Sequence, residues 1–460
     1  MKAVIMAGGH GTRIRSVASD IPKPMIPVLG KPILEYQIEN LRRCGITDIK
    51  LITGYLSECI SDYFGDGSSF GVKISYFNED RPMGTAGALY YLKEELDESF
   101  LLLMGDLMLS VDFDRFMSCH NESGAAVTLF VHPNSHPYDS DIIVTDEVKN
   151  VNDFTEDKCG INASFSDENA VLSRPVTGFI SKKAERTFFY HNQVNSGIYA
   201  ISPKVLDSIP EPIEGKVDLD KDIIHKMIDK GSVYAYSSSE YVKDMGTPER
   251  YDEVTRAVES GLYEKRNLSN RQKCVFMDRD GTLNAEKGFI NAPEAIELLP
   301  KAAEAVRTLN SSEYLAVVIT NQPVVARGEA DFESLDEIQK ALDTRLGECG
   351  AYIDGAYFCP HHTDRGFDGE VRELKFRCGC RKPEPGMILK AAAEHNIDLK
   401  GSWMIGDSTA DILCGQKLGL KTIGVLTGNA LKDGKYDVHP DFIAADMEEA
   451  VNVILNADEQ

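Results

Sequence analysis

Hydrophobic and polar positions follow the same pattern at two points of the chain. A short apolar run, Lys2–Met6, ends in the polar turn GGHGTR, and a second run, Cys274–Met277, ends in DRDGT. A parallel strand that leads into an active-site loop has this pattern in an α/β domain. The sequence therefore predicts two domains, each of which starts from such a strand.

Apolar runs alternate with stretches of helical period after both starting strands. The predicted strands are 49–53, 101–104 and 126–131 in the first region and 315–320, 403–405 and 422–425 in the second. The predicted helices are 33–44, 335–346 and 387–395. Because strands and helices alternate, we expect an α/β protein with two doubly wound parallel sheets.

A polar segment separates the two regions. The helical pattern of 248–258, with Pro248 at an early helical position, closes the first region. Residues 259–273 are mostly polar or charged and precede the second starting strand. The sequence therefore predicts a first domain at 1–258, a linker at 259–273 and a second domain at 274–460.

The overall charge excludes whole classes of partner. The 460 residues carry 49 basic and 73 acidic side chains, which gives a net charge of −24. Such a surface repels the phosphates of nucleic acids and of anionic membranes, so we expect neither as a partner. Small anionic substrates would need local cations, metal ions or backbone N–H groups. A homo-oligomer is compatible with the sequence.

The sequence also indicates the compartment. No segment is long and apolar enough to span a bilayer, and the apolar stretch before Gly8 is too short for the core of a signal peptide. Ten cysteines in a chain of this length do not suggest a disulfide scaffold. We therefore expect a cytoplasmic protein whose clustered cysteines bind a metal.

The first candidate site is the glycine-rich turn after the first starting strand. Gly8, Gly9 and Gly11 allow the backbone to approach a nucleotide closely and to present N–H groups to phosphate oxygens. The planar fork of Arg13 suits a bidentate phosphate contact, and the prolines on either side of Lys23 fix the direction of its ammonium group. A plain turn with one solvent-facing arginine is the alternative for the glycine motif alone.

With these motifs, residues 1–255 resemble the sugar-1-phosphate nucleotidyltransferase family. The further segments that carry the resemblance are GTAGA at 84–88, GD at 105–106, GFISK at 178–182, NSGIY at 195–199 and DMGTP at 244–248. The resemblance implies nucleotide contacts from Gly8, Gly9, Gly11, Thr12, Gly84, Thr85 and Ala86. It implies Mg²⁺ ligands in Asp106 and Asp244, and contacts to the sugar and its phosphate from Asn195 and Lys182.

The reaction that this resemblance implies joins two anions. An oxygen of a sugar 1-phosphate attacks the α-phosphorus of a nucleoside triphosphate and expels pyrophosphate, so catalysis consists mainly of positioning and charge neutralisation. Asp106 and Asp244 would hold one Mg²⁺ between the phosphates. Arg13 and Lys23 would stabilise the α-phosphate and the departing pyrophosphate, and Lys182 would hold the sugar phosphate. For each aspartate alone, a turn or N-cap residue is the alternative.

The second candidate site follows the second starting strand. Asp278 and Asp280 stand two positions apart in DRDGT. Asp278 can act as a nucleophile at phosphorus, and Asp280 can protonate the leaving alkoxide and then activate water. Mg²⁺ is needed to hold the two carboxylates and the phosphate together. A metal-free turn is the alternative for this motif alone.

With this motif, residues 274–455 resemble the haloacid dehalogenase phosphatases. The resemblance implies that Thr320 donates to the phosphate, that Lys382 binds it and that Asp411 supports the site. It implies Mg²⁺ ligands in Asp278, Asp280 and Asp407. Asn321 and Arg381, each next to one of these phosphate-binding residues, are further candidate substrate contacts.

Three cysteines and one histidine suggest a second kind of metal site. Cys359 and His361 are separated by sixteen residues from Cys378 and Cys380. Three thiolates and one imidazole form a closed tetrahedral set that suits structural Zn²⁺, and such a site contributes about 10 kcal/mol or more of folding free energy. His362 is the competing ligand, and free reduced thiols are the alternative to a metal.

Together the motifs suggest consecutive steps on one sugar. DRDGT with the cysteine–histidine cluster is similar to the D-glycero-D-manno-heptose 1,7-bisphosphate 7-phosphatases and the related histidinol phosphatases, and GTAGA is most similar to guanylyltransferases. The two resemblances imply a Rossmann-like nucleotide-diphospho-sugar transferase fold, followed by a haloacid dehalogenase-like fold with a zinc-binding loop. They also imply removal of the 7-phosphate and transfer of GMP from GTP to the heptose 1-phosphate.

The expected products are GDP-D-glycero-α-D-manno-heptose and pyrophosphate. GTP is implied by resemblance alone, and the anomer by the pairing of the two halves. One alternative is a mannose-1-phosphate guanylyltransferase fused to a phosphatase for another sugar bisphosphate. Another is that one half serves only as a regulatory nucleotide-binding module.

Overall fold

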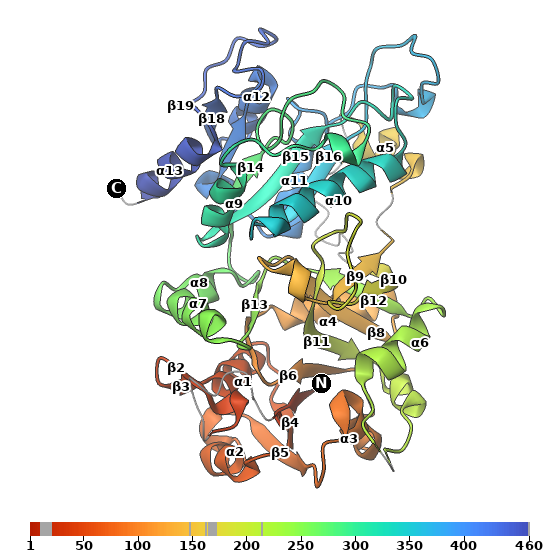
Figure 1. Cartoon of the computed structure of the whole chain (residues 1–460), viewed down its shortest axis with the longest axis vertical. Coiled ribbons are helices and arrows are strands. Elements are labelled where there is room, and N and C mark those ends of the chain that lie inside the picture. The colour runs from red at the N-terminus through yellow and green to blue at the C-terminus, as the bar shows by residue number, and fades with distance from the viewer. Residues whose placement is uncertain (10–20, 147–148, 162, 164–172, 213–214, 459–460) are drawn as a thin grey trace.

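Two α/β bodies make up the molecule, one stacked on the other (Figure 1). The computed structural model describes residues 1–9, 21–146, 149–161, 163, 173–212 and 215–458. We refer to residues 1–258 as the N-terminal half and to residues 274–460 as the C-terminal half. Within the described ranges, no helix has the length and apolar character needed to cross a membrane.

A nine-stranded sheet forms the centre of the N-terminal half. Its strands lie in the order β5 (Lys73–Asn78), β4 (Asp48–Thr53), β1 (Lys2–Met6), β6 (Phe100–Met104), β11 (Val194–Ile201), β8 (Val127–His132), β12 (Val233–Ser237), β10 (Ser173–Ile180) and β9 (Ile142–Thr145). β1, β4, β5 and β6 are parallel, whereas β11 runs antiparallel to β6 and β8. The prediction of a purely parallel sheet is wrong here, because an apolar run does not specify the direction of a strand between its neighbours.

Helices bury both faces of this sheet. Ala3 and Ile5 of β1 pack into one hydrophobic cluster, and Val4 between them packs into another on the opposite face. The first face is covered by α1 (Ile33–Arg43), α2 (Ser57–Phe64) and α4 (Phe113–Ser123), and the second by α3 (Gly84–Leu92), the π-helix η7 (Leu219–Ile224) and α6 (His225–Ile228). The short elements are β2 (Pro27–Val28), β3 (Lys31–Pro32), β7 (Leu107–Ser110), β13 (Tyr241–Asp244), α5 (Glu156–Cys159), η2 (Lys23–Met25), η3 (Ser68–Phe70), η4 (Pro137–Asp139), η5 (Val151–Phe154) and η6 (Pro203–Ser208).

A six-stranded parallel sheet forms the centre of the C-terminal half, as the sequence predicted. Its order is β16 (Gly355–Cys359), β15 (Tyr314–Asn321), β14 (Lys273–Met277), β17 (Trp403–Gly406), β18 (Lys421–Val425) and β19 (Phe442–Ala444). One face is covered by α9 (Ala302–Asn310), α10 (Phe332–Glu348) and α13 (Met447–Asp458), and the other by α11 (Gly386–Glu394) and α12 (Thr409–Lys417). Three 3₁₀ turns are η8 (Pro293–Ala295), η9 (Arg372–Leu374) and η10 (Leu399–Gly401).

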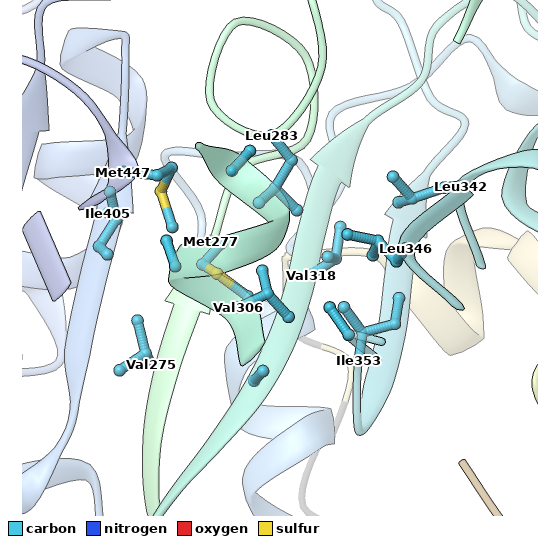
Figure 2. Packing of buried hydrophobic residues seen from close by; sticks show 14 of the residues in the cluster. Val275, Met277, Leu283, Val306, Val318, Leu342, Leu346, Ile353, Ile405 and Met447 are labelled. Atoms are coloured by element: carbon cyan, nitrogen blue, oxygen red, sulfur yellow. The ribbon is translucent and has the colours of Figure 1, made fainter. Parts of the chain in front are cut away.

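The core of this half explains the continuous apolar run of β14. Val275 and Met277 pack into the cluster that contains Val306 of α9, Leu342 of α10 and Met447 of α13 (Figure 2). Cys274 and Phe276, which alternate with them along the strand, pack on the opposite face into a cluster with residues of α11 and α12. Because both faces are buried, the strand is apolar at successive positions and ends at the first polar residue of the DRDGT turn.

The segment between the halves is folded against both of them. Tyr263 is buried, and its Oη donates to the carbonyl of Leu109 at 2.7 Å. Arg266 Nη1 donates to Asp354 Oδ1 at 3.2 Å, and these two side chains are 4% and 1% exposed. The helices here are α7 (Pro248–Glu259), which begins at the predicted proline, and α8 (Leu262–Lys265). Part of the polar composition of this segment therefore reflects buried polar contacts, as at Arg266 and Gln272, while other residues of the segment are exposed to solvent.

Further polar contacts fix the two halves to each other. The two ring nitrogens of His191 lie 2.9 Å from Asp343 Oδ2 and 3.0 Å from Asp336 Oδ1, both on α10. The backbone N of Tyr190 donates to Thr344 Oγ1 on the same helix at 2.9 Å. The orientation of the halves is thus set by specific hydrogen bonds as well as by packing.

Candidate functional sites

The glycine-rich turn lies at the carboxyl end of β1, where the parallel strands β1, β4 and β6 end together. Gly8 packs closely on the next loop, since a Cβ at this position would lie 3.4 Å from the backbone N of Gly54 and 3.3 Å from Glu79 Oε2. A Cβ at Gly9 would meet open space. Ligands of α/β proteins bind in the crevice outside such strand ends. The predicted contacts Gly11, Thr12 and Arg13 lie outside the described residues.

The GTAGA segment forms the start of α3. Gly84 has a φ of +84°, and a Cβ there would lie 2.4 Å from the carbonyl oxygen of Val217. The backbone N of Ala86 donates to the same oxygen at 3.0 Å, and Thr85 Oγ1 accepts from the backbone N of Leu219 at 2.7 Å. These bonds anchor the segment on its neighbour. A nucleotide contact through Thr85 or Ala86 stays a prediction.

Two aspartates lie on adjacent segments, Asp106 just after β6 and Asp244 at the end of β13. The carbonyl of Asp106 accepts a hydrogen bond of 3.1 Å from the backbone N of Met245, the residue after Asp244. Lys23 Nζ contacts the Asp106 carboxylate, and Arg250 Nη1 donates to both Asp244 oxygens at 2.7 and 2.8 Å. The two aspartate side chains are 33% and 36% exposed. Two accessible carboxylates on adjacent segments, each facing a cation, fit a site for Mg²⁺ and phosphate oxygens.

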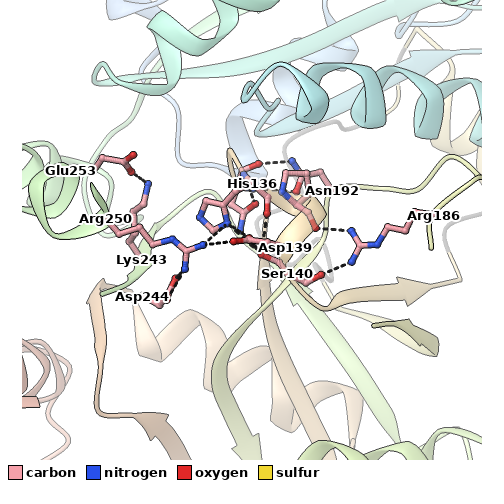
Figure 3. A network of polar contacts seen from close by, with 11 residues as sticks. His136, Asp139, Ser140, Arg186, Asn192, Lys243, Asp244, Arg250 and Glu253 are labelled. Carbon is pink, nitrogen blue, oxygen red and sulfur yellow. Dashed lines mark hydrogen bonds and ion pairs between the residues drawn. The ribbon is translucent and has the colours of Figure 1, made fainter. Parts of the chain in front are cut away.

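Arg250 also joins this site to the loop before β9. Its Nη2 donates to Asp139 Oδ2 at 2.8 Å, and His136 Nδ1 lies 2.8 Å from the other oxygen of that carboxylate (Figure 3). Burial and the guanidinium group of Arg250 lower the pKa of His136. Sequence reasoning missed Arg250 and Asp139. Arg250 lies only six residues after Asp244, and a basic residue on the first turn of the predicted helix was the one available signal.

A cavity of about 780 Å³ is lined in part by Asp106 and Asp244. The predicted sugar contacts Asn195 and Lys182 line it, together with Tyr199 and Asp220. Asn195 Nδ2 donates to Tyr199 Oη at 3.2 Å, and Tyr199 Oη donates to Asp220 Oδ1 at 3.1 Å. Burial raises the pKa of Asp220 to about 6. The volume and the mixed polar lining suit a small polar ligand.

Lys382 lies at the centre of the second site, at the carboxyl end of β14. Its Nζ is 2.6 Å from Asp278 Oδ1, 2.7 Å from Asp411 Oδ1 and 2.8 Å from the carbonyl of Ile319. Burial opposes its charge, but the carboxylates of Asp278 and Asp411 raise the pKa of Lys382 above its usual range. Burial also raises the pKa of Asp278, against the effect of the Lys382 ammonium group. The structure thus brings together the predicted nucleophile and the predicted phosphate-binding lysine.

Three carboxylates of this site form a metal-sized group. One carboxylate oxygen from each of Asp278, Asp407 and Asp411 lies within 4.8 Å of the others. A Cβ at Gly281 or Gly428 would lie 2.2 or 2.1 Å from Asp407 Oδ2, so both positions require glycine. Burial raises the pKa of Asp407 to about 6. Oxygen donors in a buried polar pocket fit Mg²⁺.

The carboxylate of Asp280 lies outside this group. It accepts hydrogen bonds from Arg279 at 2.8 and 3.0 Å, from Asn284 Nδ2 at 2.9 Å and from Gln322 Nε2 at 2.7 Å. Burial alone would raise the pKa of Asp280, but the guanidinium group of Arg279 holds it below its usual range. The sequence predicted Asp278, Asp280 and Asp407 as the Mg²⁺ ligands and gave Asp411 only a supporting role. In the structure, Asp411 takes the place of the Asp280 carboxylate in the group with Asp278 and Asp407.

The other predicted phosphate contacts surround Lys382. Asn321 and Lys382 hold each other, with Asn321 Nδ2 donating to the carbonyl of Lys382 at 3.1 Å and the backbone N of Lys382 donating to Asn321 Oδ1 at 2.9 Å. Thr320 Oγ1 accepts from Gln322 Nε2 at 2.9 Å. Arg381 Nη1 donates to the carbonyl of His361 at 3.1 Å. Asn321 and Arg381 therefore position the loop in this structure, and their contact with substrate stays a prediction.

The predicted cysteine–histidine cluster is assembled in a buried pocket. The ligand atoms of Cys359, His361, Cys378 and Cys380 all lie within 4.8 Å of one another. His361 Nδ1 is 3.3 Å from the Sγ atoms of both Cys359 and Cys380. The competing residue His362 is outside the group and accepts from the backbone N of Asp364. Three sulfurs and one nitrogen that converge in this way fit a tetrahedral Zn²⁺ site.

Comparison with family models gives two matches. Residues 2–261 match the nucleotidyl transferase family, and residues 379–450 match the HAD-hydrolase-like family. The first match covers more than half of the chain. It contains the glycine-rich turn and both aspartates of the first site, and the second match contains Lys382 and Asp407.

Known proteins resemble the two halves separately. The C-terminal part is 39% identical over 166 residues to the D-glycero-β-D-manno-heptose-1,7-bisphosphate 7-phosphatase of Pasteurella multocida, covering 36% of this chain and 88% of that protein. The N-terminal part is 32% identical to a UTP–glucose-1-phosphate uridylyltransferase of Synechocystis, over 56% of this chain and 63% of that protein. It is 29% identical to a mannose-1-phosphate guanylyltransferase of Mycobacterium tuberculosis, over 54% of this chain and 62% of that protein. The chain thus spans less than two thirds of these two transferases.

Two solved structures also match. HddC from Yersinia pseudotuberculosis, complexed with GMP-PN, is 25% identical, with a TM-score of 0.44, and the match covers 56% of this chain and 99% of that one. A D,D-heptose 1,7-bisphosphate phosphatase from B. bronchiseptica, complexed with magnesium and phosphate, is 29% identical, with a TM-score of 0.36, and the match covers 40% of this chain and 99% of that one.

Proposed function

This chain belongs to the nucleotidyl transferase family through residues 2–261 and to the heptose bisphosphate phosphatases through its C-terminal part, and on this basis we propose that it performs two consecutive reactions on one sugar. The C-terminal half removes the 7-phosphate of D-glycero-D-manno-heptose 1,7-bisphosphate. The N-terminal half transfers GMP from GTP to the resulting heptose 1-phosphate, which gives GDP-D-glycero-D-manno-heptose and pyrophosphate.

The observation that carries the proposal is the second site. Asp278, Lys382 and Asp407 converge at one strand end, in a part of the chain that is 39% identical to a heptose bisphosphate phosphatase. The family of the N-terminal half supplies the other step, because a heptose 1-phosphate is the acceptor that a sugar-1-phosphate nucleotidyltransferase requires. A phosphatase that spares the 1-phosphate would make this acceptor from the bisphosphate.

In the phosphatase reaction, an oxygen of Asp278 attacks the 7-phosphorus while the sugar oxygen leaves, which forms a phosphoaspartate. Lys382 neutralises charge on the phosphate that is transferred. Asp280 is ionised in this structure; in the proposed reaction it takes up a proton as the phosphate anion binds, donates that proton to the leaving oxygen and then accepts one from the water that hydrolyses the phosphoaspartate. Asp278, Asp407 and Asp411 would hold Mg²⁺ through their carboxylate oxygens, and the ion would supply charge neutralisation at this site.

In the transfer reaction, the phosphate oxygen of the sugar attacks the α-phosphorus of GTP and pyrophosphate leaves. Lys23, which lies beside Asp106, stabilises the negative charge on the α-phosphate and the departing pyrophosphate. Lys182 and Asn195, which line the cavity, hold the sugar phosphate. Arg250 fixes the Asp244 carboxylate by its bidentate contact. Asp106 and Asp244 would hold Mg²⁺, which supplies charge neutralisation between the phosphates.

GTP is the nucleotide that we propose. Its support is the GTAGA segment and the similarity to a mannose-1-phosphate guanylyltransferase. The similarity to a uridylyltransferase makes UTP the competing nucleotide. The similarity to a mannose-1-phosphate guanylyltransferase makes mannose 1-phosphate the competing acceptor. The nucleobase and the sugar therefore have to be tested together.

The test uses the full chain with Mg²⁺ and the α or β anomer of heptose 1,7-bisphosphate, with GTP, ATP, CTP, UTP or dTTP in separate reactions. A parallel set supplies mannose 1-phosphate as the acceptor. Mass spectrometry follows phosphate and nucleotide sugar. Phosphate release in every reaction, with NDP-heptose only from GTP, is the expected result. Phosphate release without any NDP-heptose would refute the transferase assignment, and transfer to mannose 1-phosphate alone would refute the sugar.

Two variants separate the activities. Asp278→Asn should abolish phosphate release and leave transfer to a supplied heptose 1-phosphate intact, because the nucleophile is lost from the second site only. Asp106→Asn should do the reverse, because it removes a charged ligand from the first site only. Loss of both activities in either variant would contradict the assignment of each reaction to one half.

The Cys359–His361–Cys378–Cys380 cluster holds structural Zn²⁺ in this proposal. The supporting observations are the burial of all four side chains and the convergence of their ligand atoms. All ten cysteines lie among the described residues and are free, and reduced thiols together with nucleotide substrates favour the cytoplasm. The two activities are assigned to residues 1–258 and 274–460, with 259–273 joining them.

A further inference from the structure

The cysteine–histidine cluster of the C-terminal half is closed by a segment of the N-terminal half. η5 and α5, residues 151–159, leave the nine-stranded sheet after β9 and lie beside the C-terminal half, with α5 near β16 and α10 in Figure 1. His361 Nε2 donates to the carbonyl of Phe154 at 2.8 Å. The backbone N of Gly379 donates to the carbonyl of Cys159 at 2.7 Å, and Gly160 forms an antiparallel bridge with Cys378.

These contacts involve the cluster itself. His361 and Cys378 are two of the four candidate ligands, and Gly379 lies between Cys378 and Cys380 in the sequence. The carbonyl of Phe154 can only accept, so His361 Nε2 carries the proton and Nδ1 is left with a lone pair toward the three sulfurs. A histidine ligand of zinc commonly has such an outer partner, which fixes the tautomer and the orientation of the ring. Here that partner comes from the other half of the molecule.

The side chains of this segment are packed on the same site. The ring of Phe154 stacks on Phe332 of α10 at a centroid distance of 5.3 Å, and it lies 5.3 Å from Phe358 of β16. The same ring meets His361 edge-on at 6.0 Å. Cys159 is 8% exposed and belongs to the hydrophobic cluster that contains the three cysteine ligands. The carbonyl that orients His361 is therefore held in place by half-buried aromatic packing and by the buried Cys159.

We propose that metal binding at this cluster and docking of residues 151–160 are one linked equilibrium, so that the metal fastens the N-terminal half to the C-terminal half. The inference rests on the zinc assignment above. When the segment is docked, His361 has its acceptor and the Cys378–Cys380 loop has its backbone partners. By linkage, whatever free energy docking adds to metal binding, metal binding adds to docking.

The position of the segment gives this coupling a consequence for the first site. Residues 151–160 lie between β9 and β10, and the opposite ends of these strands adjoin Asp141 and Lys182. Both of these residues line the sugar cavity, and the backbone N of Lys182 donates to Asp141 Oδ1 at 2.8 Å. The two strands that flank this segment in the sequence therefore have their other ends beside the cavity of the N-terminal half.

The first experiment measures hydrogen exchange of the full chain with zinc, after removal of zinc by a chelator, and after zinc is added back. We expect peptides from 149–161 to lose protection without zinc and to regain it, together with those from 359–380, while peptides from α1 stay unchanged. If only 359–380 respond while metal analysis finds one zinc per chain, the zinc site stands and the coupling is refuted. If metal analysis finds no zinc, the zinc assignment of the cluster is wrong, and the proposed coupling is wrong with it.

The second experiment measures zinc affinity by competition with a chromogenic chelator. Phe154→Ala should weaken zinc binding by about 10- to 100-fold, the usual cost of disturbing an outer partner of a metal ligand. Phe189→Ala is the matched control, because Phe189 is also a half-buried phenylalanine of the N-terminal half that packs against the C-terminal core, away from the cluster. Equal zinc affinities in the two variants would overturn the proposal.

Discussion

Glu240 makes the stability of this protein depend on pH in a predictable direction. Glu240 is 3% exposed and lies where the N-terminal half meets residues 259–273, the segment between the halves. One carboxylate oxygen accepts from the backbone N atoms of Asp112 at 2.7 Å and Leu268 at 3.0 Å, and the other accepts from Ser238 Oγ at 3.0 Å. Burial outweighs these donors and raises the pKa of Glu240 from 4.5 to about 7.

The sign and size of the effect follow from this shift. Because the folded protein holds the proton more tightly than the unfolded chain, the neutral carboxyl contributes stability that is complete below pH 4.5 and is lost as the pH rises through about 7. Between pH 5 and pH 8 the loss amounts to about 2–3 kcal/mol. Glu240→Gln keeps the acceptor oxygen and the shape but carries no charge at either pH.

The assay is thermal or urea unfolding of the full chain at both pH values. Glu240→Gln should gain about 2–3 kcal/mol relative to the wild type on going from pH 5 to pH 8. Glu122→Gln, which removes an exposed carboxylate from α4, controls for the change in net charge. If the difference between Glu240→Gln and the wild type is the same at pH 5 and pH 8, the reasoning about the buried carboxyl is wrong.

Three further substitutions test the two sites and the join between the halves. Lys382→Met should lower phosphate release at least about 100-fold without slowing nucleotidyl transfer, since it removes the cation at the transferred phosphate, and a loss below tenfold would contradict that role. Arg250→Met should lower kcat/KM for transfer by about 10- to 100-fold, because Asp244 loses its bidentate partner, while phosphate release serves as the internal control. Arg266→Met should cost about 3–5 kcal/mol in unfolding experiments, because it leaves Asp354 buried without its cation, and Arg266→Met with Asp354→Leu should recover part of that loss.

Local patterns in the sequence determined much of the chemistry. The apolar run of β14 followed by DRDGT placed Asp278 at a strand end, and the spacing of Cys359, His361, Cys378 and Cys380 predicted a cluster that the structure assembles with His361 rather than His362. These features could be recognised because a strand end or a short loop fixes the relative positions of neighbouring residues. The antiparallel direction of β11 could not, since it depends on which strands lie beside it.

Only the tertiary structure decided which distant groups meet. It placed Asp411 rather than the Asp280 carboxylate in the group around Asp278, and it aimed Arg250 at Asp244. It also brought the carbonyl of Phe154 to the ring of His361, across 207 positions of the chain. The sequence by itself determined the residue types and the local turns that present them. Their partners were decided by the packing of whole sheets, because a contact between distant residues forms only when both elements are held in place by their own cores.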